Sequence, residues 1–94
     1  MIDYEKIKSV NYRQIKIMKH TIGFNGDKVK GRIYRQFEPV RNYYDAGKSD
    51  MPHMQKLVKL GLMTKYRPNY FEVTEDGRKF LSMVLDVEIL PETD

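Results

Sequence analysis

Two stretches of this sequence contain basic residues and no acidic residue, and these bases are the side chains with the clearest potential chemistry. The stretches run from residue 6 to residue 26 and from residue 51 to residue 71. Ammonium and guanidinium groups that no carboxylate neutralises attract phosphates and other polyanions. Residues 1–71 carry 15 bases against 6 acids, whereas residues 72–94 carry 2 bases against 7 acids. We therefore expect one positive face, unless acids distant in the sequence cover it.

The second stretch has the spacing of a helix with one polar side. A helix over residues 51–60 that buries Met54, Leu57 and Val58 directs its polar residues outward. An amide can pair with an adenine edge, and a lysine suits phosphate or guanine. Ordinary solvated lysines are the alternative interpretation. The candidate DNA-binding residues are His53, Gln55, Lys56 and Lys59 on this helix, Lys65, Arg67 and Asn69 beyond it, and Lys16 and Lys19 in the first stretch.

Other kinds of chemistry lack the residues that they need. The chain has no cysteine, so it contains neither a disulfide nor a thiolate metal ligand. His20 and His53 have no carboxylate cluster near them in the sequence, and a metal site needs more ligands than two. Helix capping accounts for Ser49 and Asp50, which otherwise suggest ion ligands. Because a nucleophile elbow and a glycine-rich phosphate loop are also missing, the sequence predicts no enzyme, no cofactor and no metal site.

Aromatic residues interleaved with arginines form a second candidate surface. Such rings can stack on unpaired bases or contact a protein partner, although core and rim positions are the commoner explanation. Arg41 and Asn42 can instead fasten the segment through bonds from side chain to backbone. The aromatic residues are Tyr34, Phe37, Tyr43 and Tyr44, and the interleaved bases are Arg32, Arg35 and Arg41.

Length and composition limit the architecture. A chain of 94 residues predicts one domain spanning residues 1–94, with a frayed tail from about residue 90. No apolar run approaches the ~20 residues of a membrane span. We therefore expect a cytoplasmic protein that does not enter the membrane.

Helical periodicity covers the first quarter of the chain. Apolar residues at spacings of three and four predict one helix, or two in succession, over residues 3–22. Asp3 can cap the first turn, Asn11 with Gln14 resembles a second cap, and Gly23 is a plausible end. The apolar residues are Ile7, Val10, Ile15, Met18 and Ile22.

The middle of the chain is less regular. Residues 31–37 predict a short helix from Ile33, Tyr34 and Phe37, which Pro39 must terminate. A turn and an irregular segment then lead to a loop at residues 46–48. The next helix is expected to start at Ser49 or Asp50, to accept Pro52 in its first turn, and to end at a left-handed Gly61.

Two short strands and a last helix complete the predicted elements. Residues 62–66 and 70–74 are expected to form a hairpin around Arg67-Pro68-Asn69. Thr74 is expected to cap a helix with acids in its first turn. A hairpin this short must pack on helices to be stable. This order of elements predicts a mostly helical α+β fold with three helices, a short two-stranded wing and a C-terminal helix. The apolar stripe of the last helix is Phe80, Leu81, Val84 and Leu85.

The segment "MQKLVKLGLMTKYRPNYFEVTEDGRKFL", residues 54–81, resembles the winged helix-turn-helix superfamily. MarR-type and PadR-type regulators carry a comparable pattern of spaced leucines, Gly-Leu, a basic strand, a short wing and Thr-Glu-x-Gly. The resemblance implies a groove helix at 51–60 and a wing at 65–70 that bind double-stranded DNA. This wing is shorter than that of many regulators, and Pro39 interrupts the segment before the groove helix. A weaker likeness to small phage or prophage proteins rests on "KHTIG" at 19–23 and "RNYY" at 41–44.

A different class of function fits the same fold, because fold alone does not decide function. The alternative is a non-catalytic adaptor of phage or bacterial origin that contacts proteins through the segment from Tyr34 to Tyr44 and through the acidic C-terminus. Winged-helix regulators commonly dimerise, and the apolar tail from Val84 to Leu90 could extend such an interface.

Overall fold

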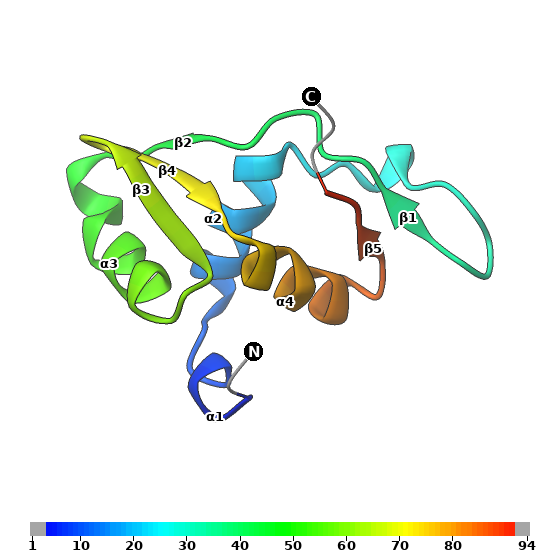
Figure 1. The fold of residues 1–94 in the computed structure, drawn as a ribbon, viewed down its shortest axis with the longest axis horizontal. Helices are drawn as coiled ribbons and strands as arrows, with labels where there is room; N and C mark the ends of the chain where they lie inside the picture. The colour runs from blue at the N-terminus through cyan, green and yellow to red at the C-terminus, as the bar shows by residue number, and fades with distance from the viewer. Residues whose placement is uncertain (1–3, 92–94) are drawn as a thin grey trace.

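The computed structural model describes residues 4–91 of the chain as an α+β domain (Figure 1). Helices pack on one face of a small three-stranded sheet, and a second, two-stranded sheet lies beyond it. The expected cap at Asp3 and the fraying of residues 92–94 fall outside the described residues. No helix within residues 4–91 is both long and apolar enough to cross a membrane.

Two helices occupy the N-terminal quarter. Helix α1 (Tyr4–Ile7) is one turn long, and α2 (Tyr12–Ile22) follows after a break. The predicted cap is confirmed, because the Asn11 side chain accepts from the backbone of Gln14 while the Gln14 side chain accepts from the backbone of Asn11. Gly23, at φ 68°, ends α2 as predicted. Capping at Asn11 therefore starts a new helix after the break.

The segment between α2 and α3 is not helical, and the helix predicted over residues 31–37 is wrong. It contains the 3₁₀ turn η1 (Gly26–Lys28), the two short strands β1 (Gln36–Phe37) and β2 (Tyr44–Asp45), and a second 3₁₀ turn just before α3. The predicted fastening is confirmed: Arg41 donates to the His20 carbonyl at 2.7 and 3.1 Å, and Asn42 exchanges two hydrogen bonds with the Val73 backbone. Side-chain bonds to the backbone of α2 and of residue 73 thus hold residues 41–42 in place.

A second 3₁₀ turn, η2 (Lys48–Asp50), leads directly into α3 (Met51–Lys59). Pro52 lies in its first turn, as expected. Gly61, at φ 79°, follows the helix, and the Leu62 amide donates to the Leu57 carbonyl at 3.0 Å. This is the Schellman pattern, which satisfies the last free carbonyls of a helix.

The predicted hairpin is present and has a third neighbour. Strands β3 (Met63–Arg67) and β4 (Tyr70–Val73) pair antiparallel, and β2 pairs with the other side of β4, giving the order β2-β4-β3. At the turn, Asn69 has φ 68° after Pro68. A positive φ in the residue after proline is typical of a type II turn.

Helix α4 (Glu75–Leu85) follows the hairpin, and Thr74 caps it by accepting from the Gly77 amide at 3.0 Å. The chain then adds β5 (Glu88–Ile89), which pairs in parallel with β1. The Leu90 amide donates to the Phe37 carbonyl, so the frayed tail does not begin at residue 90. Because Val87 and Ile89 are buried in this same chain, they are not available as the apolar interface suggested for the tail.

The core lies between α2, α3, α4 and the sheet. Of the predicted inward residues, Met54, Leu57, Phe80 and Leu81 are almost fully buried. The prediction that Val58 and Val84 lie in the core is wrong, because their side chains remain 39% and 43% exposed. A helix on the surface of a small domain buries a narrower stripe than the full run of its apolar residues.

Candidate nucleic-acid interface

The exposed side of α3 forms a ridge between two open hollows. We call Gln55 and Lys59, four residues apart on α3, the α3 ridge. One hollow, of about 310 Å³, separates the ridge from Lys65 on β3. The other lies toward the linker between α1 and α2 and is lined by the ridge, Pro52 and Leu60 among others. A protruding helix side with depressions along both flanks has the shape that a groove in nucleic acid accommodates.

The pairing of the hairpin brings Lys65 to this place. In the sheet register Lys65 lies opposite Phe71, and directly paired residues in antiparallel strands share a face. Phe71 is buried toward α3, so Lys65 extends the same face to the surface. Met51, Val58 and Phe71 make an apolar floor in this hollow. The site thus combines basic and amide groups at its rim with an apolar floor.

The bases of this site keep their charge uncompensated. Within residues 4–91, Lys59, Lys65 and Arg67 make no ion pair with a carboxylate. Glu72, the acid closest in sequence to the hairpin turn, pairs with Thr64, one position out of step with Lys65, and therefore lies on the opposite face of the sheet. The acid-rich C-terminal part does not neutralise these three bases in the described part of the chain.

Arg67 and Asn69 lie at the end of the hairpin. Arg67 is exposed there and pairs with Tyr70 across the turn. Asn69 is also exposed. Its backbone is left-handed, a conformation that asparagine tolerates better than most residues, so Asn69 has a structural reason to occupy the turn. Its carbonyl accepts from the Ala46 amide at 2.7 Å, which fastens the turn to the end of β2.

Two predicted DNA-binding residues on α3 bond to neighbouring segments of the chain, and Lys56 also lines the second hollow. His53 and Lys56 were expected on the outer side, but the His53 Nδ1 lies 3.2 Å from the Gln14 amide nitrogen, and the Lys56 ammonium donates to the Ser9 carbonyl. Together with Asp50 they form a polar row at spacings of three along α3. This row attaches α3 to the N-terminal end of α2 and to the linker before it, so His53 and Lys56 help to position α3.

Asp50 begins the polar row and has an unexpected role. It occupies the cap position of α3, yet its side chain makes no capping bond. One carboxylate oxygen accepts from the Arg13 guanidinium at 2.6 Å, and the other accepts from the Tyr44 hydroxyl at 2.8 Å. The capping role assigned to Asp50 is therefore wrong, and its carboxylate instead joins α2, β2 and the start of α3.

The three groups shift one another's ionisation. The hydrogen bond from Arg13 lowers the pKa of Asp50, which overcomes the opposing effect of burial, and the bond from Tyr44 lowers it further. Burial raises the pKa of the Tyr44 hydroxyl, and its bond to Asp50 adds to the rise. The Arg13 pKa rises because of the same carboxylate. Asp50 is thus held as an anion, and Tyr44 as a neutral donor.

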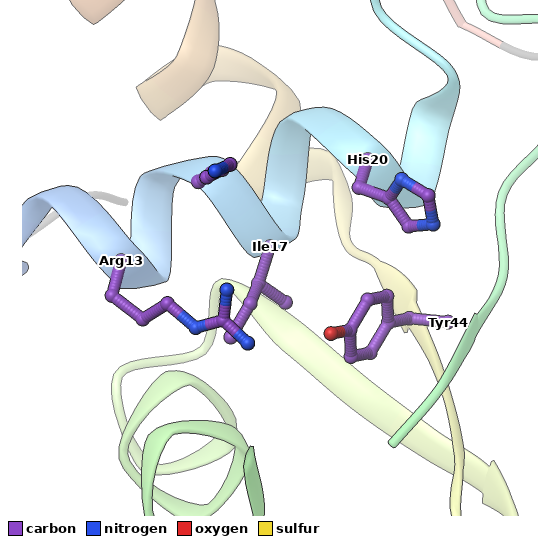
Figure 2. A pocket seen from close by; sticks show the side chains of 5 residues that line it. Arg13, Ile17, His20 and Tyr44 are labelled. Atoms are coloured by element: carbon purple, nitrogen blue, oxygen red, sulfur yellow. The ribbon is translucent and has the colours of Figure 1, made fainter. Parts of the chain in front are cut away.

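Lys16 and Lys19 both belong to α2 but have different environments. Lys16 lines a hollow of about 230 Å³ together with Arg13, His20 and Tyr44 (Figure 2). The His20 ring meets the Tyr44 ring edge-on at 5.6 Å. Lys19 is half-buried, with its ammonium 5.6 Å from the centre of the Phe24 ring. Lys16 remains free for a flanking contact, whereas Lys19 packs along the end of its helix.

The aromatic segment divides between interior and surface. Phe37 is buried against Phe24, whereas Tyr44 is half-buried, bonds to Asp50 and lines the hollow beside Arg13. Tyr34 and Tyr43 are 84% and 50% exposed. Of the four aromatic residues predicted to contact a protein partner, Tyr34 and Tyr43 are the two that are exposed.

Several residues of the site were not predicted. Met51 and Phe71 form the floor of the ridge hollow, and no pattern in the sequence marks them as lining residues. Val58 had a misleading signal, because its apolar character and spacing favoured the core. Only the observed packing of β3 against α3 identifies this floor.

The sequence matches no protein-family model, and comparisons with curated proteins and with solved structures yield no significant match. The function must therefore be argued from the geometry and charge of the described residues.

Proposed function

We propose that this protein binds double-stranded DNA through the α3 ridge and the adjoining hairpin. The observation that carries the proposal is that Gln55, Lys59 and Lys65 line one open hollow on the surface, with both lysines unpaired within residues 4–91. These three belong to the residues that the sequence nominated for DNA contact. The proposal no longer includes His53 and Lys56, because both contact α2 and its linker.

In this mode α3 enters the major groove with its ridge toward the bases. The Gln55 amide has the donor and acceptor that an adenine edge requires, and Lys59 can contact guanine or phosphate. Met51 and Val58 can touch thymine methyl groups, for which apolar contact is the usual recognition. Lys65 and Arg67 then lie against the flanking backbone, where bases fix the orientation of the protein.

We infer further that the domain is a reduced winged helix of regulatory or phage origin. Helix α2, helix α3 and the β3–β4 hairpin follow the order of that architecture, and α4 follows the wing. The strand β2 and the turn η2 stand where a helix-turn-helix has its middle helix. Support for α3 in this arrangement comes from the bonds that its polar row makes with α2 and the preceding linker, and not from a preceding helix.

A mobility-shift assay with a mixed-sequence duplex tests the proposal. The Lys59→Gln/Lys65→Gln variant should bind about tenfold more weakly, because two phosphate-contacting charges are lost. Lys79→Gln is the matched control, since Lys79 is an exposed lysine on α4 that pairs with Glu75 at 3.7 Å, away from the ridge. Equal weakening by Lys79→Gln, or full binding by the double variant, would contradict the assignment of this surface.

A protein-interaction adaptor is the second candidate function. The exposure of Tyr34 and Tyr43 favours it, because large aromatic side chains in water are common at protein interfaces. The two functions differ in their response to charge removal. An adaptor that uses these tyrosines would keep its partner when Lys59 and Lys65 are neutralised and lose it when the tyrosines are truncated.

A further inference from the structure

The loop before β1 presents two apolar side chains at the tip of a short basic hairpin. Lys30 and Gln36 pair by two backbone hydrogen bonds of 2.8 and 2.9 Å, and the five residues between them form a loop that we call the finger (residues 31–35). At its tip Ile33 is 86% exposed and Tyr34 is 84% exposed. Figure 1 shows the finger projecting past β1, at the other end of the molecule from α3.

The finger has a defined conformation. Gly31 has φ 91°, a region that side chains rarely adopt, and an added Cβ atom there would collide with the Tyr34 carbonyl. Below the loop, Phe37 is buried and β1 pairs with β5. The fold therefore holds Ile33 and Tyr34 away from the core on an anchored support, although burying them would stabilise the domain.

Charge identifies the kind of partner that this tip fits. Residues 28–37 contain Lys28, Lys30, Arg32 and Arg35 and no acid. Arg32 and Arg35 stand immediately on either side of the two apolar residues. Architectural proteins often insert apolar wedges between base steps, and basic side chains are attracted to the negative potential of the minor groove. The tip offers both kinds of side chain next to each other. A membrane surface would call for a wider apolar face than two side chains.

We propose that the finger is a second nucleic-acid contact, in which Ile33 and Tyr34 enter the minor groove of a duplex and Arg32 and Arg35 contact its phosphates. This inference rests on the proposed function, because α3 supplies the first contact. The longest extent of the molecule is 38 Å, close to the ~34–36 Å of one turn of B-DNA. Contacts at both ends can therefore fall within about one turn, and the wedge would bend the duplex between them.

Bending is the property that tests this inference, because the wedge and the charges contribute to it differently. The probe is a short duplex that carries a donor dye and an acceptor dye at its two ends. Wild-type protein should raise energy transfer by bending the duplex. Ile33→Ser/Tyr34→Ser should still bind, with less than about tenfold loss, yet leave the duplex straight, because only the unstacking step is removed. Arg32→Gln/Arg35→Gln should lower the salt slope of binding by about 1.8.

Val40→Ser is the matched control, because Val40 is an exposed apolar residue outside the finger. A position-specific readout complements the bend. Since the chain has no cysteine, Ile33→Cys permits a single photo-crosslinker, which should attach to base pairs of the bound duplex. Thermal melting verifies that each variant is folded.

The outcomes separate the two proposals. Bending that survives in Ile33→Ser/Tyr34→Ser, or crosslinking from residue 33 to another protein or to anionic vesicles but not to DNA, would overturn the finger proposal and leave the α3 site intact. Wild-type protein that does not bind the duplex at all would overturn both. Finger-dependent binding that persists in Lys59→Gln/Lys65→Gln without loss would support the finger and contradict the α3 site.

Discussion

Arg13 donates a hydrogen bond to Asp50 at 2.6 Å, although the two residues lie 37 positions apart. Asp50 also accepts from Tyr44, so one carboxylate joins α2, β2 and the start of α3. The orientation of α3, and hence the direction of its ridge, depends on this contact and on the two polar contacts that follow it along the helix.

Asp50→Ala should lower the free energy of unfolding by about 1–3 kcal/mol, because the half-buried Tyr44 hydroxyl and the Arg13 guanidinium lose their acceptor. Urea denaturation followed by circular dichroism measures the change. Ser49→Ala is the control, since the Ser49 side chain is exposed beside Asp50. If both substitutions gave the same small change, the carboxylate would not be the connecting element.

The contribution of Asp50 should depend on pH in a defined direction. Its pKa is lowered in the folded state, so the folded protein binds fewer protons than the unfolded chain near the ordinary carboxyl pKa of about 3.9. The stability difference between wild type and Asp50→Asn should be constant above about pH 5 and shrink as the pH falls below about 4. Unfolding curves at a series of pH values check this. A difference that grows on acidification would be inconsistent with the lowered pKa.

Lys56 and Lys59 should behave oppositely although they lie three residues apart. Lys56→Ala should lower the free energy of unfolding by about 1 kcal/mol, because its bond to the Ser9 carbonyl is lost, and should leave DNA affinity within about twofold. Lys59→Ala should leave stability unchanged within about 0.5 kcal/mol and weaken DNA binding. Denaturation and mobility-shift titration of both variants measure the contrast. The reverse pattern would mean that Lys56 faces the ligand.

Gly77→Ala should be destabilising by about 1–3 kcal/mol, because the added methyl group would collide with the Leu62 carbonyl and crowd the Val73 side chain where α4 packs on the hairpin. Gly47→Ala is the matched control: its added Cβ meets no atom, and its φ of −80° suits alanine. Thermal denaturation compares the two variants. Equal melting temperatures would show that α4 can move away from Leu62 and Val73 without a loss of stability.

Local signals predicted the elements that local chemistry determines. The Asn11–Gln14 cap, the left-handed Gly23 and Gly61, the Thr74 cap and the hairpin around Pro68-Asn69 are all present. Each depends on a side chain or a backbone angle within a few residues, which a single sequence displays. Helix α3 and the hairpin were therefore placed within about one residue of their observed bounds.

Non-local contacts account for the errors. The residues 31–37 have helical spacing, yet Gln36 and Phe37 pair with Glu88 and Ile89 from the other end of the chain. Aspartate is a preferred cap residue, yet the Asp50 carboxylate accepts from Arg13 and Tyr44 and makes no capping bond to α3. Strand pairing and ion pairing over such separations leave no periodic trace in the sequence.

The candidate site shows the same division. Gln55 and Lys59 were correctly expected on the surface, because helical periodicity places them opposite Met54 and Leu57. The same periodicity could not separate Lys56 from Lys59, since the position of the linker before α2 decides which of them has a bonding partner. Selecting the outer side of a surface helix needs the position of its neighbours as well as its own pattern.

The affinity for a DNA duplex as a function of salt tests the central claim most directly. If Lys59, Lys65 and Arg67 neutralise phosphates, the logarithm of the association constant should fall against the logarithm of salt concentration with a slope of about −2.7 or steeper. Lys59→Gln/Lys65→Gln/Arg67→Gln should reduce that slope by about 2.7. A wild-type affinity that does not change with salt, or a slope that the triple variant leaves unaltered, would contradict the claim that the α3 ridge and its hairpin bind DNA.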